Sequence, residues 1–150
     1  MALGSDANQP VTSPGNLGAA DTANRNGVIF EAADRAEDGG AGSDGVYTSE
    51  ELHNFGARGV DIFINTTSTG TGTVTVKLQK KDPASGTWFD IAGATSAAVA
   101  DDADAYFTVY PGIAETANVS ISDHIGLIWR AHATVATANV TFSVGAVYLR

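Results

Sequence analysis

Residues 60–79 read VDIFINTTSTGTGTVTVKLQ and decide the fold class. Apolar and polar side chains alternate in both halves of this stretch; the apolar positions are Val60, Ile62 and Ile64, then Val74, Val76 and Leu78. Successive side chains of a strand point to opposite faces of a sheet, so this period predicts two strands that each bury one face. The polar, glycine-containing residues 66–72 lie between them, and an antiparallel hairpin is the simplest connection.

The same pattern extends outward from this stretch along the chain. Further strand-like runs are found at 88–91, 105–110, 125–135 and 140–149, with a weaker one at 46–52. Pro83 and Gly86 predict one turn, Pro111 and Gly112 end a strand, and the small, acidic residues 92–104 are expected to loop out. About seven strands at this spacing predict an all-β fold, an antiparallel β-sandwich or jelly-roll-like domain over residues 46–150.

Residues 1–45 have a different composition, dominated by Gly, Ala, Asn, Asp, Ser and Pro. Low hydrophobicity combined with net negative charge predicts a flexible, extended and acidic N-terminal arm. Val28, Ile29 and Phe30 form a short apolar island within it. We expect this island to be a short strand or a helical turn that docks either on a partner or on its own domain.

Charge and composition exclude several function classes. The net charge is −9, with nine acidic and two basic residues in 1–51, whereas nucleic-acid binding depends mainly on Lys and Arg. We therefore expect no direct nucleic-acid partner. The chain has no cysteine, no apolar run of about 20 residues and no N-terminal signal-peptide pattern, so we expect a soluble, non-secreted protein without a membrane partner.

The sequence contains no recognisable catalytic motif. His53, His124 and His132 are far apart, and neither a G-x-S-x-G, an H-E-x-x-H nor a phosphate-binding glycine motif occurs. Acidic clusters such as residues 101–104 do not match a calcium-binding loop and are interpreted as solvated. We expect no enzyme activity, no metal and no cofactor; a hydrolase that uses His124 or His132 with a nearby carboxylate is the weakest alternative.

Two groups of residues are candidates for contact with a partner. Arg130 and His132 alternate on one strand face and are a candidate subunit interface. Trp88, Tyr106 and Tyr110 are candidates for stacking on sugar rings, although aromatic residues in strands more often serve as core or cross-strand partners.

Residues from about 59 to 150 resemble a group of small structural proteins from the head-gene regions of tailed bacteriophages. The resemblance rests on VTVKLQKKDPASGTWFDI (74–91), TVYPGIAETANVSISD (108–123), the pair Trp129-Arg130 and TFSVGAVYL (141–149). It implies a virion component, most plausibly a decoration (cement) protein. Such a protein is made in the host cytoplasm and binds the major capsid protein on the outer surface of the head, often as a trimer, which is the oligomer that the resemblance implies here. The rival interpretation is a carbohydrate- or receptor-binding module displayed on the virion.

Overall fold

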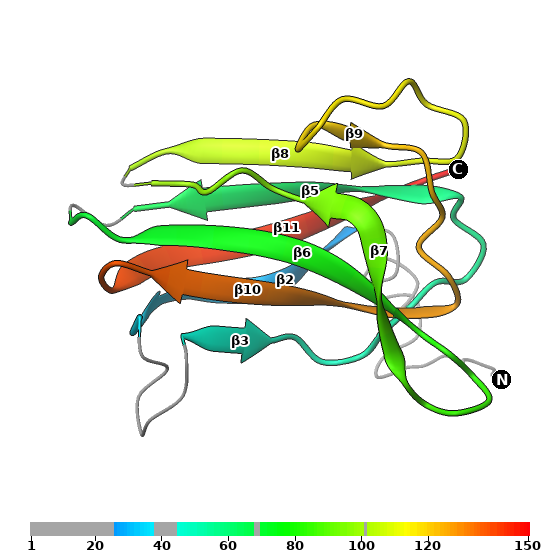
Figure 1. Cartoon of the computed structure of the whole chain (residues 1–150), viewed down its shortest axis with the longest axis horizontal. Helices are drawn as coiled ribbons and strands as arrows, with labels where there is room; N and C mark the ends of the chain where they lie inside the picture. Colours follow the sequence, from blue (N-terminus) through cyan, green and yellow to red (C-terminus); the bar gives the residue numbers. More distant parts are fainter. Residues whose placement is uncertain (1–25, 38–44, 68–69, 101) are drawn as a thin grey trace, which may run out of the picture.

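The computed structural model describes residues 26–37, 45–67, 70–100 and 102–150, which form β-strands joined by turns and loops (Figure 1). The strands are β2 (Asn26–Arg35), β3 (Val46–Thr48), β4 (Leu52–His53), β5 (Gly59–Thr66), β6 (Thr73–Lys81), β7 (Trp88–Thr95), β8 (Asp104–Val109), β9 (Ser120–Ile121), β10 (Ile128–Ala136) and β11 (Val140–Leu149). No helix occurs within these ranges, so they also contain no helix that would cross a membrane.

The strands pair into two sheets. One has the order β3-β10-β6-β7, with β4 also pairing with β10, and the other has the order β2-β11-β5-β8-β9. All of these pairings are antiparallel except that of β8 with β9, which is parallel. The prediction of an all-β, mostly antiparallel fold is confirmed.

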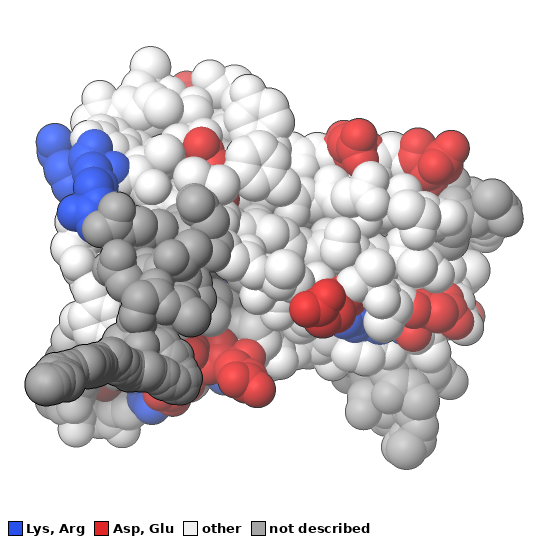
Figure 2. Space-filling model, turned by 180° about the vertical axis from the view of Figure 1, so that it is seen from behind, with Lys and Arg blue, Asp and Glu red and all other residues white. Residues whose placement is uncertain are grey.

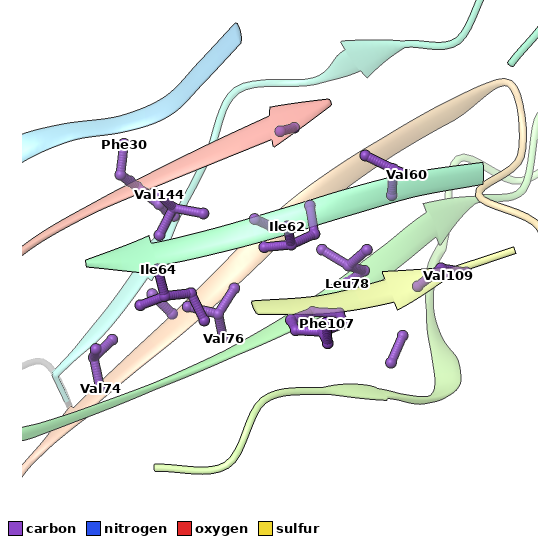
Figure 3. Packing of buried hydrophobic residues seen from close by; sticks show 14 of the residues in the cluster. Phe30, Val60, Ile62, Ile64, Val74, Val76, Leu78, Phe107, Val109 and Val144 are labelled. Atoms are coloured by element: carbon purple, nitrogen blue, oxygen red, sulfur yellow. The ribbon is translucent and has the colours of Figure 1, made fainter. Parts of the chain in front are cut away.

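Both sheets contribute to one apolar core. Inward residues of β5 and β8, such as Ile62 and Phe107, belong to the same buried cluster as Val76 and Leu78 of β6. Figure 3 shows these side chains gathered between strands of the two sheets. Trp129 of β10 is the largest fully buried side chain, and its indole N–H donates to the Tyr148 hydroxyl at 3.0 Å. The alternation of apolar and polar residues in the sequence therefore corresponds to one buried and one outer face of these strands.

The predicted hairpin between residues 60–65 and 74–79 is wrong. The first stretch lies in β5 and pairs with β11 and β8, whereas the second lies in β6 and pairs with β10 and β7. The connection after Thr66 thus passes from one sheet to the other. Its length explains the error, because tight hairpins usually use two to five loop residues and this connection is longer. Alternation predicts a buried face equally well for strands that pair and for strands that face each other.

The apolar island of the N-terminal segment is part of β2, which pairs with β11 of its own domain. Phe30 is only 8% exposed and contacts Phe142 edge to face, with ring centroids 5.8 Å apart. Arg35 lies 4.4 Å from the centre of the Phe142 ring and donates to the Phe142 carbonyl oxygen. The expected domain start at residue 46 is corrected accordingly, since Asn26–Arg35 belongs to the folded unit. Residues 1–25 and 38–44 of the expected arm lie outside the described residues.

Three strand boundaries also differ from those expected. β7 continues to Thr95, within the region expected to loop out, and Val99 then forms an isolated bridge with Val74. The run expected at 125–135 begins as a strand only at Ile128, because Gly126 has a φ of 74° that interrupts the extended backbone. The weak candidate at 46–52 is divided between β3 and β4.

Replacing Phe30 with alanine tests whether β2 is an integral strand. We expect Phe30→Ala to lower the free energy of unfolding by about 3 kcal/mol, because a buried ring and its contact with Phe142 are lost. The matched control is Val28→Ala in the same strand, whose side chain is 62% exposed and whose loss is expected to change stability by less than about 0.5 kcal/mol. Urea unfolding followed by tryptophan fluorescence measures both; equal stabilities for the two variants would contradict the placement of β2.

Candidate functional site

The outer face of the β2-β11-β5-β8-β9 sheet carries a row of apolar residues. In the strand register, Val28 of β2 lies opposite Gly145 of β11, Gly145 lies opposite Phe63 of β5, and Phe63 lies opposite Tyr106 of β8. Val28 is 62% exposed, Phe63 45% and Tyr106 58%. We call these four residues the apolar row. Three of the four strands therefore place an exposed apolar side chain in this row, and the fourth, β11, contributes a glycine.

Phe63 and Tyr106 are the aromatic half of the row. Their ring centroids lie 5.9 Å apart with an angle of 23° between the ring planes, so the rings are stacked. A stacked cross-strand pair is held in a defined orientation and presents one amphipathic surface to solvent. The tyrosine hydroxyl supplies the polar tip of that surface.

The face is hollowed beside the aromatic pair. A depression of about 410 Å³ is lined by Phe63, Ile64, Asn65, Asp104, Ala105, Tyr106, Ser143 and Gly145. Gly145 forms a gap in the row because it has no side chain. A β-carbon built there would have the Gly27 carbonyl oxygen as its nearest neighbour, at 3.6 Å, which is an ordinary contact. The gap is therefore a consequence of residue type and not of crowding.

Polar residues flank the apolar row on both sides. One neighbouring register row contains Ser143, Asn65 and Asp104, and the Asn65 amide donates to the Asp104 carboxylate. The other contains Asp61 and Thr108, where the threonine hydroxyl donates to the carboxylate, together with Val147, which is 36% exposed. Figure 2, seen from behind Figure 1, shows this side of the molecule as mostly uncharged, with separate groups of acidic side chains spread over it. An apolar patch with a polar rim is typical of a protein-binding surface.

The outer face of the other sheet is polar and its groups are paired with one another. The Arg130 guanidinium lies 4.1 Å from the centre of the Trp88 ring and donates to the Gln79 side-chain oxygen at 2.8 Å. Asp90 accepts hydrogen bonds from Gln79 at 2.7 Å and from Lys77 at 2.9 Å. These two bonds hold the pKa of the Asp90 carboxyl below its ordinary value.

His132 lies opposite Lys77 on this polar face, in the register of β10 with β6. Burial lowers the pKa of its imidazole, and the nearby charges of Lys77 and Arg130 lower it further. Its Nδ1 atom is buried and has no hydrogen-bond partner in the described part of the chain. The predicted pair of Arg130 and His132 does share one strand face, with both side chains partly buried.

The three predicted sugar-contact residues do not form one platform. Trp88 belongs to β7, in the sheet opposite Tyr106, and its ring is covered by Arg130 and by Lys81, whose amine lies 5.4 Å from the ring centre. Tyr110 follows β8 but interacts with Arg58, whose guanidinium lies 5.0 Å from the tyrosine ring centre. Of the three, only Tyr106 is part of the apolar row.

The remaining sequence candidates lie elsewhere. In the apolar island, Val28 joins the row, while Ile29 and Phe30 pack on the core. His124 contacts the Asp123 carboxylate at 3.0 Å, and Lys80 binds the same carboxylate at 3.1 Å. Across residues 26–37, 45–67, 70–100 and 102–150, no group of three or more His, Asp or Glu side chains is arranged to hold a metal ion.

Sequence reasoning missed Phe63 and Gly145. Both looked ordinary, one as the outward residue of an alternating strand and the other as a glycine within the last strand. Their shared register depends on the pairing of β5 with β11, which periodicity does not encode. No family model matches the chain, and no curated protein or solved structure matches it. The outer surface is therefore interpreted from its own geometry.

The lowered pKa of His132 predicts a pH-dependent stability. A base whose pKa is lower in the folded than in the unfolded state binds more protons when unfolded, so folding is favoured above the ordinary histidine pKa of 6.5 and loses stability as the pH falls below it. We expect the urea midpoint to decrease from pH 7.5 to pH 5 and expect His132→Gln to reduce this decrease. Lys77→Met should reduce it as well, because a positive neighbour is removed. An unchanged pH dependence in His132→Gln would contradict this assignment.

Proposed function

We propose that the protein is a virion structural protein, a decoration (cement) protein that binds the outer surface of a tailed-phage head and stabilises it. The observation that carries this proposal is the apolar row with its stacked Phe63–Tyr106 pair, exposed on one sheet face. Exposed aromatic residues within a polar rim fit a surface that is covered on assembly. The resemblance of residues 59–150 to small phage head proteins supplies the kind of partner, the major capsid protein.

The fold suits this role. We interpret the two sheets, whose inward residues share one core, as a β-sandwich or jelly-roll-like domain. A rigid sheet presents side chains at fixed spacings, so many copies on a repeating shell can each make the same modest contact. Such a role depends on a complementary surface and requires neither catalysis nor a cofactor.

We further propose that the protein acts as a trimer, with contacts between subunits made on the polar face and through the N-terminal arm. Arg130 and His132 are the candidates on that face, because both belong to β10 and their side chains are partly exposed there. Residues 1–25, which precede β2, are long enough to reach an adjacent subunit.

A second candidate function is a carbohydrate- or receptor-binding module. It is favoured by the same aromatic pair, because sugar rings stack on exposed aromatic faces while neighbouring side chains such as Asn65 and Asp104 accept or donate hydrogen bonds. This alternative now rests on Tyr106 with Phe63 and no longer on Trp88 or Tyr110, whose rings are engaged with arginine side chains.

Capsid binding by a variant of the apolar row tests the proposal. We expect Tyr106→Ala to weaken co-sedimentation with matching empty capsids about fivefold or more, because an aromatic ring that anchors a binding surface contributes over about 1 kcal/mol. The matched control is Phe89→Ala, since Phe89 lies in the other sheet and is 55% exposed, close to Tyr106 at 58%.

The outcomes of that experiment separate the two candidate functions. Saturation of capsids at a fixed stoichiometry, lost in Tyr106→Ala and kept in Phe89→Ala, supports decoration through this face. If the wild-type protein does not bind capsids but binds a glycan array, and Tyr106→Ala abolishes the glycan binding, the second candidate function replaces the first. Capsid binding that is equal in both variants contradicts the assignment of this face.

Deletion of residues 1–25 tests the role of the arm. Because this deletion keeps β2, the domain is expected to retain its urea midpoint within the error of the measurement. We expect the trimer mass measured by light scattering, or the affinity for capsids, to decrease. A truncated protein that forms trimers and binds capsids with the affinity of the full-length protein would contradict the proposed arm contact.

A further inference from the structure

The hollow in the apolar row has the chemical features of a site for one positively charged side chain. The stacked Phe63–Tyr106 pair forms its aromatic wall, the Asp104 carboxylate lies in the neighbouring row, and Gly145 leaves the space open. Aromatic faces attract cations through the ring quadrupole, and a carboxylate nearby adds charge complementarity. The site thus combines two groups that each favour a cation.

The chain supplies a cation to several of its other aromatic rings. Arg35 lies 4.4 Å from the centre of Phe142, Arg58 lies 5.0 Å from that of Tyr110, and Arg130 lies 4.1 Å from that of Trp88. Within the described residues, no lysine or arginine lies over Phe63 or Tyr106. The exposed Phe63–Tyr106 pair is therefore an aromatic surface of the kind that binds arginine elsewhere in the molecule, but no cation of the described residues occupies it.

The Asp104 carboxylate likewise has no cationic partner among the described residues. One of its carboxylate oxygens accepts the Asn65 amide, and no Lys or Arg in the described ranges forms a salt bridge with it. By contrast, Asp90 and Asp123 on the rest of the domain are each paired with a lysine. The protein as a whole carries a net charge of −9, which favours approach of a basic partner surface.

We propose that the hollow between Phe63, Tyr106, Asp104 and Gly145 receives an arginine side chain of the protein partner. The planar guanidinium stacks on the aromatic pair while its edge donates hydrogen bonds to Asp104, a combination that the compact ammonium of lysine reproduces only in part. This inference deepens the proposed function and rests on it in one respect, that the occupant comes from a protein and not from a glycan.

A peptide titration without capsids tests the inference directly. The probes are acetyl-Gly-Arg-Gly-amide and its matched controls, acetyl-Gly-Lys-Gly-amide and acetyl-Gly-Glu-Gly-amide, added at millimolar concentration to the full-length, ¹⁵N-labelled chain. We expect saturable NMR shifts of the Gly145, Tyr106 and Asn65 signals with the arginine peptide, binding weakened about threefold or more with the lysine peptide, and no binding with the glutamate peptide.

Two variants act on the site without changing the core. Gly145→Val places a side chain in the hollow, in a strand position where a β-carbon has no closer neighbour than 3.6 Å, and should abolish the shifts. Asp104→Asn removes the charge and should weaken binding about fivefold or more. Glu115→Gln is the charge-matched control in an exposed loop, and Phe89→Ala is the aromatic control; both should bind like the wild type. Retained dispersion of the NMR spectrum shows that each variant is folded.

The outcomes separate this inference from the proposed function. Absence of saturable shifts in the wild type, shifts elsewhere on the surface, or equal binding by Gly145→Val overturns the arginine site, even if capsids still bind. Arginine-specific shifts that Gly145→Val abolishes support the site, even if the capsid experiment fails. A failure of decoration alone thus leaves the peptide result intact.

Discussion

The strict alternation of side chains along β5, β6, β10 and β11 is the constraint on which the rest of the structure depends. Each of these strands places every second residue in the shared core, where Ile62, Leu78, Ala131 and Val144 are at most 1% exposed. The intervening residues must then lie on an outer face, whatever their chemistry. With no disulfide to stabilise it and with few charges inside, the domain depends on this apolar layer. The outer faces are consequently free to differ from each other, and they do.

The same constraint explains what could and could not be predicted from the sequence. Strand existence follows from local period, so β5, β6, β8 and β11 are predicted close to their observed bounds, and β10 is predicted with a start three residues too early. Sheet membership does not, because Ile62 and Val76 are buried in the same way whether their strands pair side by side or face each other across the core. The sequence leaves open whether the island at residues 28–30 docks on a partner or on its own domain, and residues 1–45 are assigned to the arm because Glu31 and Asp34 look like residues of an acidic arm. The burial of Phe30, the inward residue of β2, depends on contact with Phe142, which is distant in the sequence.

The candidate site is harder to predict than the fold, since it is defined by register. Val28, Gly145, Phe63 and Tyr106 are widely separated in the chain and belong to four strands. Tyr106 was singled out because exposed aromatic residues are common in binding surfaces, but Trp88 and Tyr110 were singled out for the same reason and turn out to be engaged with arginine side chains. Residue type alone cannot distinguish an aromatic ring that already has its cation from one that does not.

The contrast between the two outer faces bears on how such a protein would assemble. On the face of β10 and β6, Arg130, Gln79 and Asp90 are connected by hydrogen bonds and the Trp88 ring is covered, so a subunit that contacts Arg130 in the proposed trimer has to replace existing interactions. On the face of β11 and β5, the apolar row is exposed, and within the described residues the Asp104 and Asp61 carboxylates beside it are bonded only to neutral groups, so a partner adds contacts without breaking an ion pair. Binding that breaks few interactions retains more of the free energy gained from buried aromatic area. A contact of modest area therefore gains the most binding free energy on the face that carries the apolar row. The hollow admits one side chain of the partner and so fixes where the partner sits on this face.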